Sequence, residues 1–377
     1  MKIVIAPNAF KNSLPAAAVA AALEEGIRRS GYTGTLVCCP VGDGGDGTGS
    51  LLTQYLDAEL LFADVADPLG RSVRASFGWV SKTKTAILEM ADASGLRLLR
   101  PEEYDPLHAS TLGCGQLIKA ALDQGATELL LCIGGSATVD GGAGALSALG
   151  LQLYDRDGTL LSPLPVDLIR LHNIDRSRLD QRLHGITITI LCDVKNHLLG
   201  EKGAAAVFGP QKGAGVREVL LLETALQQWR RIVLQTTGTD MDRLESSGAA
   251  GGMAAGLAAF CKVKIVDGIR YFLQKIGFEQ ELENTDWVIT GEGAIDLQTL
   301  EGKAPFGVAA MAKQKGIPVI GIAGKLPDRV SPGLQAYFSW LLSINEQPLA
   351  LEEAIRQTKS NLVRTGEKIG TALKNKA

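Results

Sequence analysis

Short apolar runs that end in glycine-rich polar loops recur along this chain of 377 residues, and they constrain its fold more than any other feature. Residues 2–6 (KIVIA) are expected to form a strand, 15–29 a helix and 35–41 (TLVCCPV) a second strand. Ser13 is the expected N-cap of that helix, and Pro15 suits its first turn. Fully apolar strands that alternate with helices indicate a parallel sheet covered by helices on both faces.

The C-terminal part of the chain repeats this pattern. Strands are expected at 287–290, 318–324 and 339–344, and helices at 305–315 and 351–375. An α/β fold is therefore predicted at both ends of the chain.

The middle of the chain has some antiparallel character. Residues 72–90 contain VRASFGWV and TAILEMA, joined by the polar SKTK, which predicts a hairpin. A helix near 113–124, a buried strand at 129–135, a glycine- and alanine-rich helix from 141 and a strand at 186–194 follow.

A chain of this length usually splits into two domains. We predict a discontinuous Rossmann-like lobe, with a parallel sheet, from residues 1–62 and 286–377. Residues 63–285 would form an inserted second α/β lobe, with the active site in the cleft between the two. The alternative is two consecutive domains that divide near residue 180.

Composition excludes several classes of protein. The formal net charge of −3 and the absence of like-charge runs argue against a nucleic-acid partner. The six cysteines show no C-x-x-C spacing and are expected to be buried, reduced thiols. Four scattered histidines argue against a histidine metal site, and no apolar run is long enough to span a membrane. We expect a cytoplasmic protein without a membrane partner, and a homodimer is one assembly that we consider.

Five loops share one style, in which glycines are mixed with Asp, Ser, Thr or Lys. They are PNAFKNSL (7–14), PVGDGGDGT (40–48), IGGSATVDGGAGALSALG (133–150), CDVKNHLLGEKGAAAVFGPQKGA (192–214) and ITGEGAIDLQTLEGKAPFGVA (289–309). Such loops lie where α/β sheets bind ligands, and their backbone N–H groups suit anions. Carboxylates suit Mg²⁺, and lysines suit a transferring phosphoryl group. None of the loops is a P-loop, so only their number indicates a phosphoryl-transfer site.

Individual residues in these loops have simpler interpretations as well. Asp43 and Asp46 could cap the helix that follows Thr48, and one of Glu292 and Asp296 could also be a cap.

The lysines and two aspartates of the loops are more informative. Lys303 lies at a helix start, where anions bind, and Lys11 precedes a helix, so both are expected to be functional. Lys212 lies between glycine turns and could equally be a surface lysine or a residue of the site. Asp140 and Asp193 follow apolar strands, which places them at the sheet edge where ligands bind.

Taken together, the loops resemble the type I glycerate kinase family. MADASGL (90–96), DPL (105–107), GCGQLI (113–118) and GAAGG (248–252) match family motifs in the family's order. FGPQKGA (208–214) and the segment ITGEG…D…QT…GK.P.GVA are long and specific. The matches run from the first residues to beyond residue 325.

The resemblance implies a two-lobed α/β kinase that uses ATP and Mg²⁺ to phosphorylate D-glycerate, with 2-phosphoglycerate the usual product of this class. Lys11 and Ser13 would hold the carboxylate of glycerate. Asp193 or Asp140 would accept the hydroxyl proton or hold Mg²⁺, and Lys303 and Lys212 would face the phosphates of ATP. The expected catalytic residues are Asp193, Asp140, Lys303 and Lys11, with Asp193 and Asp296 as metal ligands. The expected binding residues are Asn8, Ser13, Asp43, Gly44, Gly45, Gly135, Ser136, Gln211, Lys212, Gly291, Glu292 and Asp296.

The chain departs from the family pattern at five positions. Asn8 replaces an Asp, Val139 an Asn, Lys195 a Thr, His197 a Pro and Ala294 an Arg. An asparagine cannot act as a base, and loss of the arginine removes a clamp for a carboxylate or phosphate. Two alternatives are therefore a weakly active homologue that binds a small anion or nucleotide, and a kinase for a related hydroxy acid.

Overall fold

The structure is a computed structural model and describes residues 1–347 and 349–375. The chain divides into two compact units, one made of Met1–Asp43 with Asp267–Ala377 and one made of Gly44–Val266. The first unit thus contains both chain ends, and the second is continuous. The expected boundaries lay at 62/63 and 285/286. Residues 44–62 instead fall in the second unit because their helix packs on its sheet, and residues 267–285 fall in the first because their helix packs on a helix there.

The sheet of the first unit has five parallel strands in the order β13-β12-β11-β1-β2. Counted along this unit alone, the order is 2-1-3-4-5, which is a doubly wound arrangement. Its strands are β1 (Lys2–Ile5), β2 (Thr35–Cys38), β11 (Trp287–Ala294), β12 (Val319–Lys325) and β13 (Trp340–Ser343).

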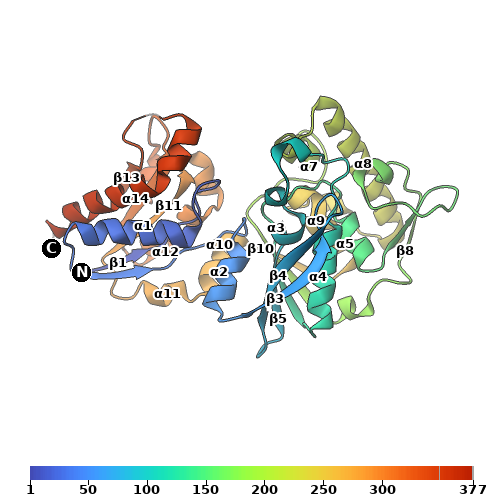
Figure 1. Cartoon of the computed structure of the whole chain (residues 1–377), viewed down its shortest axis with the longest axis horizontal. Coiled ribbons are helices and arrows are strands. Elements are labelled where there is room, and N and C mark those ends of the chain that lie inside the picture. Colours follow the sequence, from blue (N-terminus) through green and yellow to red (C-terminus); the bar gives the residue numbers. More distant parts are fainter. Residues whose placement is uncertain (348, 376–377) are drawn as a thin grey trace. The chain divides into compact units, whose positions relative to one another are not determined.

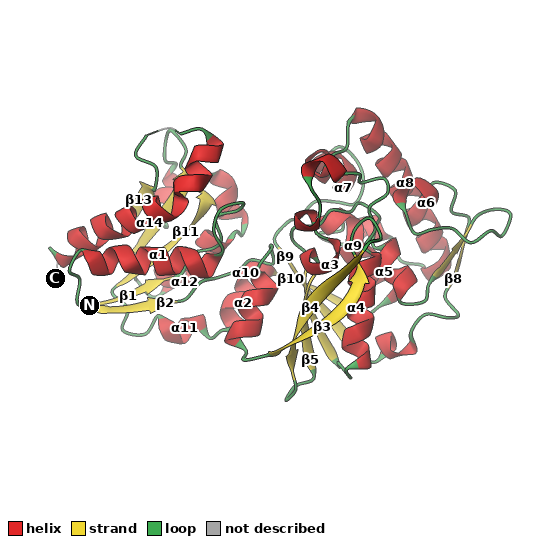
Figure 2. Ribbon diagram, in the orientation of Figure 1, coloured by secondary structure: helices red, strands yellow, loops and turns green. Residues whose placement is uncertain are grey.

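Helices cover both faces of this sheet. They are α1 (Ala16–Arg29), α10 (Gly268–Lys275), α11 (Phe278–Glu281), the 3₁₀ helix η7 (Leu297–Glu301), α12 (Ala304–Gln314), α13 (Pro332–Gln335) and α14 (Leu351–Lys374). Figures 1 and 2 show α1 and α14 side by side over the sheet. Alternate strand residues such as Ile3, Ile5 and Ile289 pack against these two helices. The intervening residues face α12 and are also fully buried.

The second unit contains a six-stranded sheet in the order β10-β9-β6-β5-β4-β3. Strands β5, β6 and β9 are parallel, whereas β3, β4 and β5 pair antiparallel. The strands of this unit are β3 (Glu59–Ala66), β4 (Ser72–Val80), β5 (Thr85–Glu89), β6 (Glu128–Cys132), β9 (Thr187–Cys192) and β10 (Val263–Asp267), with β7 (Gln152–Tyr154) and β8 (Asn173–Asp175) in a separate antiparallel pair.

The helices of the second unit pack on this sheet and enclose a single large core. They are α2 (Thr48–Tyr55), α3 (Ala91–Ser94), α4 (Leu112–Asp123), α5 (Ala143–Ala148), α6 (Pro165–Leu168), α7 (Ala204–Phe208), α8 (Val216–Thr237) and α9 (Met253–Phe260). The 3₁₀ helices are η1 (Leu96–Leu98), η2 (Pro101–Glu103), η3 (Gln181–His184), η4 (Pro210–Lys212), η5 (Met241–Arg243) and η6 (Ala249–Gly252).

The predicted mixed α/β fold rich in parallel strands is confirmed, and so is the hairpin of β4 and β5. The N-cap assignment was wrong. Pro15 occupies that position, while the Ser13 hydroxyl donates to the carbonyl of Ile355, 3.1 Å away. Strand β3 was not predicted.

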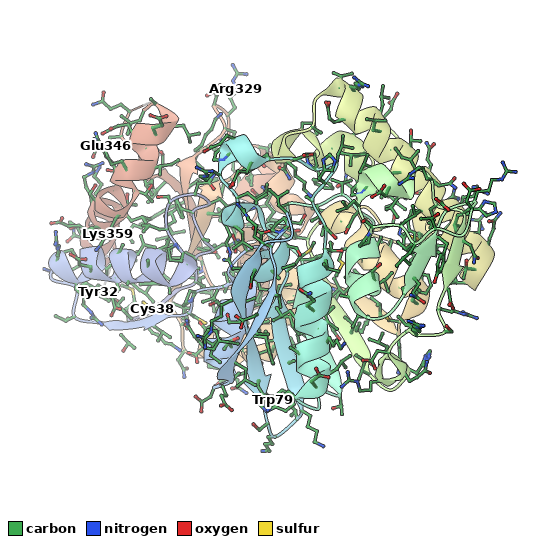
Figure 3. The ribbon with its side chains drawn as sticks, turned by 45° about the vertical axis from the view of Figure 1, so that its right-hand side comes forward. Tyr32, Cys38, Trp79, Arg329, Glu346 and Lys359 are labelled. Carbon is green, nitrogen blue, oxygen red and sulfur yellow. The ribbon has the colours of Figure 1, made fainter. Side chains whose placement is uncertain are left out.

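All six cysteines are free thiols, as expected, but Cys38 is exposed. It ends the edge strand β2, which has a neighbour on only one side (Figure 3).

Candidate active site

In the first unit, the predicted binding residues Asn8 and Gly291 lie at the neighbouring strands β1 and β11, where the strand order of the sheet changes direction. Strands β1 and β11 are neighbours although about 280 residues separate them along the chain. Their outgoing segments lead to opposite faces of the sheet, and doubly wound folds bind ligands at that point. The Asn8 amide N–H donates to the carbonyl of Gly291, 2.8 Å away, which joins the two segments there. Gly291 admits no side chain, because a Cβ would lie 2.1 Å from the Ile322 carbonyl oxygen.

Asn8 and Asp43 form a buried pair. The side-chain Nδ2 of Asn8 donates to Oδ2 of Asp43 at 2.9 Å, and its Oδ1 accepts the N–H of Ala9 at 2.8 Å. Asn8 and Asp43 are only 8% and 6% exposed. Asn8 therefore orients the Asp43 carboxylate, a contact that an aspartate at position 8 could make only by sharing a proton.

Glu292 is a buried carboxylate in this unit, and its pKa is raised. Burial raises the pKa of Glu292 to about 7, while the charge of Lys303 lowers it and that of Asp43 raises it. The Lys303 ammonium lies 3.7 Å from Oε1 of Glu292, and Lys11 also lowers this pKa. Two predicted lysines and two predicted carboxylates thus act on one another electrostatically.

A helix start and a threonine complete this cluster. Lys303 is the N-cap of α12. Pro305 has no N–H, and the N–H groups of Phe306 and Gly307 donate to the carbonyl of Lys303 at 3.1 Å, so among the first three helical residues Ala304 keeps its N–H for an anion. The Thr299 hydroxyl accepts the Asp296 N–H at 3.1 Å and donates to Glu292 at 3.5 Å. Thr299 was not among the predicted residues, and its position within the QT motif was the available signal.

In the second unit, β5, β6 and β9 end at one edge of the sheet. The loops that follow β6 and β9 carry predicted residues, among them Gly135 and Asp193, both exposed. The N–H of Gly134 donates to the carbonyl of Gly44 at 3.0 Å, which brings the loop of Gly44 and Gly45 to the same edge.

Asp140 lies beneath this edge and not at its surface. It is 0% exposed and accepts hydrogen bonds from Thr111 N and Oγ1, Gly142 N and Gly144 N at 2.7–3.2 Å. Burial raises the pKa of Asp140, and these hydrogen bonds oppose the shift. The geometry favours a structural role that fixes the start of α5 over the predicted catalytic one.

Lys212 is also buried, at 1% exposure. Its ammonium donates to Oγ of Ser136 and to the carbonyl of Thr138, both at 2.7 Å. Burial lowers the pKa of Lys212 to about 7, against the charge of Asp140. Lys212 thus fixes the loop after β6, while its exposed neighbour Gln211 faces outward.

Several departures from the family pattern can also be placed. Val139 is fully buried in the core, while Lys195 and His197 are exposed.

The interpretation of Asp43 and Asp46 as caps of α2 was wrong. Gly47 is the N-cap, and Asp46 instead forms an ion pair with Arg97 at 2.8 Å. The acceptor for the start of α2 is Glu89, which the sequence analysis missed.

No group of three or more His, Cys, Asp or Glu side chains within residues 1–347 and 349–375 could hold a metal ion. Mg²⁺ bound through a nucleotide needs only one or two carboxylates, because phosphates and water complete its shell. Single carboxylates such as Asp193 and Asp296 fit that mode of binding better than they fit a resident metal.

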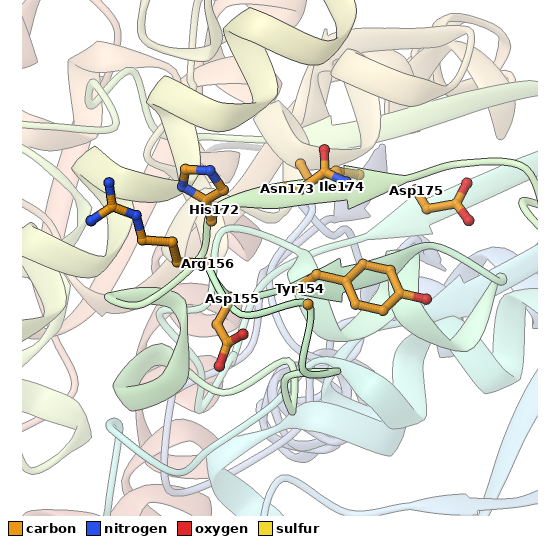
Figure 4. A pocket seen from close by; sticks show the side chains of 8 residues that line it. Tyr154, Asp155, Arg156, His172, Asn173, Ile174 and Asp175 are labelled. Atoms are coloured by element: carbon orange, nitrogen blue, oxygen red, sulfur yellow. The ribbon is translucent and has the colours of Figure 1, made fainter.

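A pocket at β7 and β8 contains none of the predicted residues (Figure 4). Two of its carboxylates serve local turns, because Asp155 accepts the N–H groups of Asp157 and Thr159, and Asp175 that of Ser177. We therefore assign this pocket no part in the site.

The model of the glycerate kinase family matches residues 3–374. The chain belongs to the glycerate kinase family. It is 42% identical to the glycerate 2-kinase of Escherichia coli, over 99% of this chain and 98% of that protein. It is 41% identical to the glycerate kinase of Halalkalibacterium halodurans, over 97% of each.

A solved structure gives the same result for the fold. The crystal structure of putative glycerate kinase 2 from Salmonella typhimurium matches with a TM-score of 0.82 and 40% identity, over 100% of this chain and 98% of that chain. The predicted family and class of enzyme, a kinase, are confirmed. None of the helices in the described ranges combines the length and apolar character needed to cross a bilayer.

Proposed function

We propose that this protein transfers the γ-phosphoryl group of ATP to a hydroxyl group of D-glycerate, giving ADP and phosphoglycerate. The observation that carries this proposal is the 42% identity to a glycerate 2-kinase over nearly the whole of both chains. The name of that relative favours the 2-hydroxyl as the acceptor. A cytoplasmic location is part of the proposal, and the assembly stays a prediction.

Lys303 is proposed to neutralise phosphate charge. It combines an ammonium with the N-terminus of α12, where the helix dipole favours an anion. Glu292, 3.7 Å away, would hold that ammonium in place. Lys11, which is exposed, would bind the carboxylate of glycerate.

Asp193 is the better candidate for the base. It is exposed directly after β9, whereas Asp140 has no exposed surface. Mg²⁺ would bridge the phosphates of ATP and reduce their charge. Asp296 is the proposed carboxylate for it, and Asp193 would be the alternative ligand if another group served as the base.

The test is an ADP-release assay with D-glycerate, ATP and Mg²⁺. Turnover that requires D-glycerate is expected, and Lys303→Ala should lower kcat by about 10²-fold through loss of charge stabilisation. Lys82→Ala, in the exposed turn between β4 and β5, is the matched control and should change nothing. If the folded protein shows no turnover but is stabilised against heat by ATP, the result would contradict the kinase and support the alternative of a homologue that only binds the nucleotide.

The product identifies the hydroxyl. Phosphorus attached at C2 couples to one carbon-bound proton, and at C3 to two, so ³¹P NMR of the product separates them. A panel of 2-hydroxy acids in the same assay tests the kinase for a related substrate.

A further inference from the structure

Helix α2 begins without a capping side chain of its own. Its N-cap, Gly47, has φ 90° and ψ −7°, a left-handed conformation that favours glycine. The usual N-cap residues, Ser, Thr, Asp and Asn, accept a helix N–H from an extended backbone conformation, which Gly47 does not adopt. The N–H groups at this helix start therefore need an acceptor from another part of the chain.

Glu89, the last residue of β5, supplies that acceptor. Its Oε1 accepts the N–H of Gly47 and its Oε2 lies 3.4 Å from the N–H of Ser50. The side chain is 5% exposed and fits tightly, since a Cβ at Gly49 would lie 3.2 Å from both its Cβ and its Oε2. Glu89 thus fixes the start of α2 to the edge of the sheet where β5 ends.

The loop before α2 is held on a second side by Arg97. The guanidinium of Arg97 pairs with Asp46 at 2.8 Å and with Asp92, and its Nε donates to the carbonyl of Ala91. Asp92 also accepts the hydroxyl of Ser76, 3.1 Å away. This network joins the loop to the segment that follows β5.

The same loop packs backbone against backbone on the loop after β6. A Cβ at Gly134 would lie 2.4 Å from the Cα of Gly45, so only glycine fits there. The Thr48 hydroxyl accepts the N–H of Gly44 at 3.1 Å and closes the turn. Small changes at the start of α2 would therefore move Gly44 and Gly45.

We propose that Glu89 is a positioning residue of the substrate site, which holds the Gly44–Thr48 loop in its binding conformation by capping α2. This inference rests on the proposed function and on the expected contact of Gly44 and Gly45 with substrate or nucleotide. Glu89 acts through the loop and contacts no reacting atom.

The protonation of Glu89 is compatible with this role. Burial raises the pKa of Glu89 to about 7, the Gly47 N–H lowers it, Asp46 raises it, and Arg97 lowers it. A protonated carboxyl retains an acceptor oxygen for the Gly47 N–H. Glutamine has the same shape and acceptor, so Glu89→Gln is the conservative variant.

The experiment compares Glu89→Ala, Glu89→Gln and the control Asp180→Ala. Asp180 caps η3 by accepting the N–H of Arg182 at 3.0 Å. Helix η3 precedes β9, so it lies near the amino ends of the parallel strands, whereas the Gly44–Thr48 loop lies near their carboxyl ends. For Glu89→Ala we expect the KM of at least one substrate to rise about 5- to 10-fold with a smaller change in kcat, the effect of a lost cap on a binding loop. Glu89→Gln should restore KM to near the wild-type value, and Asp180→Ala should leave both KM values unchanged.

Amide hydrogen exchange of residues 44–55 gives a readout independent of activity. Exchange should be faster in Glu89→Ala and close to wild type in Glu89→Gln. KM values in Glu89→Ala within twofold of wild type, or KM values that rise equally in Asp180→Ala, would overturn the proposal. If the wild-type protein has no kinase activity, the proposed function fails, and unchanged exchange in Glu89→Ala then overturns the positioning role by itself.

Discussion

Lys212 holds an ammonium group in the interior, where two neutral oxygens accept its hydrogen bonds. Its pKa is lowered to about 7, so between pH 7 and the unfolded value of 10.5 the unfolded chain binds more protons than the folded chain. The free energy of unfolding should therefore rise with pH across this window, by up to about 1.4 kcal/mol per pH unit from this group. Urea unfolding of wild type and Lys212→Met from pH 7 to 10 measures the difference.

The control for this prediction is Lys82→Met, at an exposed lysine. Its curve should run parallel to that of the wild type, whereas the curve of Lys212→Met should lack the increment. Parallel curves for all three proteins would mean that Lys212 titrates normally.

Glu292 should change the free energy of unfolding with pH in the opposite direction. Its pKa is raised from 4.5 to about 7, so the folded chain binds more protons than the unfolded chain between these values. Stability should fall as pH rises through this window, and Glu292→Gln should remove that decline.

The same variant loses the partner of Lys303, so its kcat should fall by about tenfold or more. Unfolding and ADP-release assays at pH 5 and 7.5 test both. A variant whose stability falls between these pH values as much as that of the wild type, or whose kcat is unchanged, contradicts the assignment.

At the scale of elements, α1 and α14 approach each other through glycines. A Cβ at Gly26 would lie 1.9 Å from the carbonyl oxygen of Val363, and one at Gly366 would lie 2.5 Å from that of Leu23. Alanine favours an isolated helix over glycine by about 1 kcal/mol. Gly26→Ala should nevertheless destabilise the protein by about 1–3 kcal/mol, because the helices must move apart. Thermal and urea unfolding measure this, with the exposed Ser360→Ala in α14 as a control expected to change little.

The elements with local signals were predictable, whereas those defined by distant partners were not. Apolar runs identified β1, β6, β9 and β12, because burial on both faces leaves a continuous hydrophobic pattern. Strand β3 (ELLFADVA) has no regular alternation of polar and apolar residues, since Leu60 and Phe62 are exposed, and its pairing with β4 completes it. It was missed for that reason.

The same distinction applies to the candidate site. Glycine-rich loops were visible in the sequence, but burial was not. Glu89 is 42 residues from Gly47, and Lys212 is 76 residues from Ser136, so only the folded chain shows what they contact. Asp140 and Asp193 both lie in polar loops after apolar strands, yet Asp193 is exposed directly after β9, whereas Asp140 is fully buried farther along the loop after β6. Spacing alone cannot distinguish these outcomes.

At the scale of the whole molecule, the second unit is a continuous segment with its own core. Residues Gly44–Val266 include the six-stranded sheet except for its last residue, Asp267, and the large cluster of buried residues around it. A segment of about 220 residues with such a core is in the size range of domains that fold alone. We therefore expect residues 44–267, expressed separately, to unfold cooperatively, with a far-UV spectrum of mixed α/β type.

This fragment should have no kinase activity, because it lacks Lys303, Glu292 and Lys11. Glu89→Ala made in the fragment should speed exchange at residues 44–55 as it does in the full chain, since every contact of Glu89 and Arg97 described above lies within this unit. A fragment that is unfolded, or in which residues 44–55 exchange at the intrinsic rate before any substitution, would mean that the first unit is needed to order the loop. A folded fragment in which residues 44–55 are protected from exchange would establish that the conformation of Gly44–Thr48 is encoded by the second unit alone.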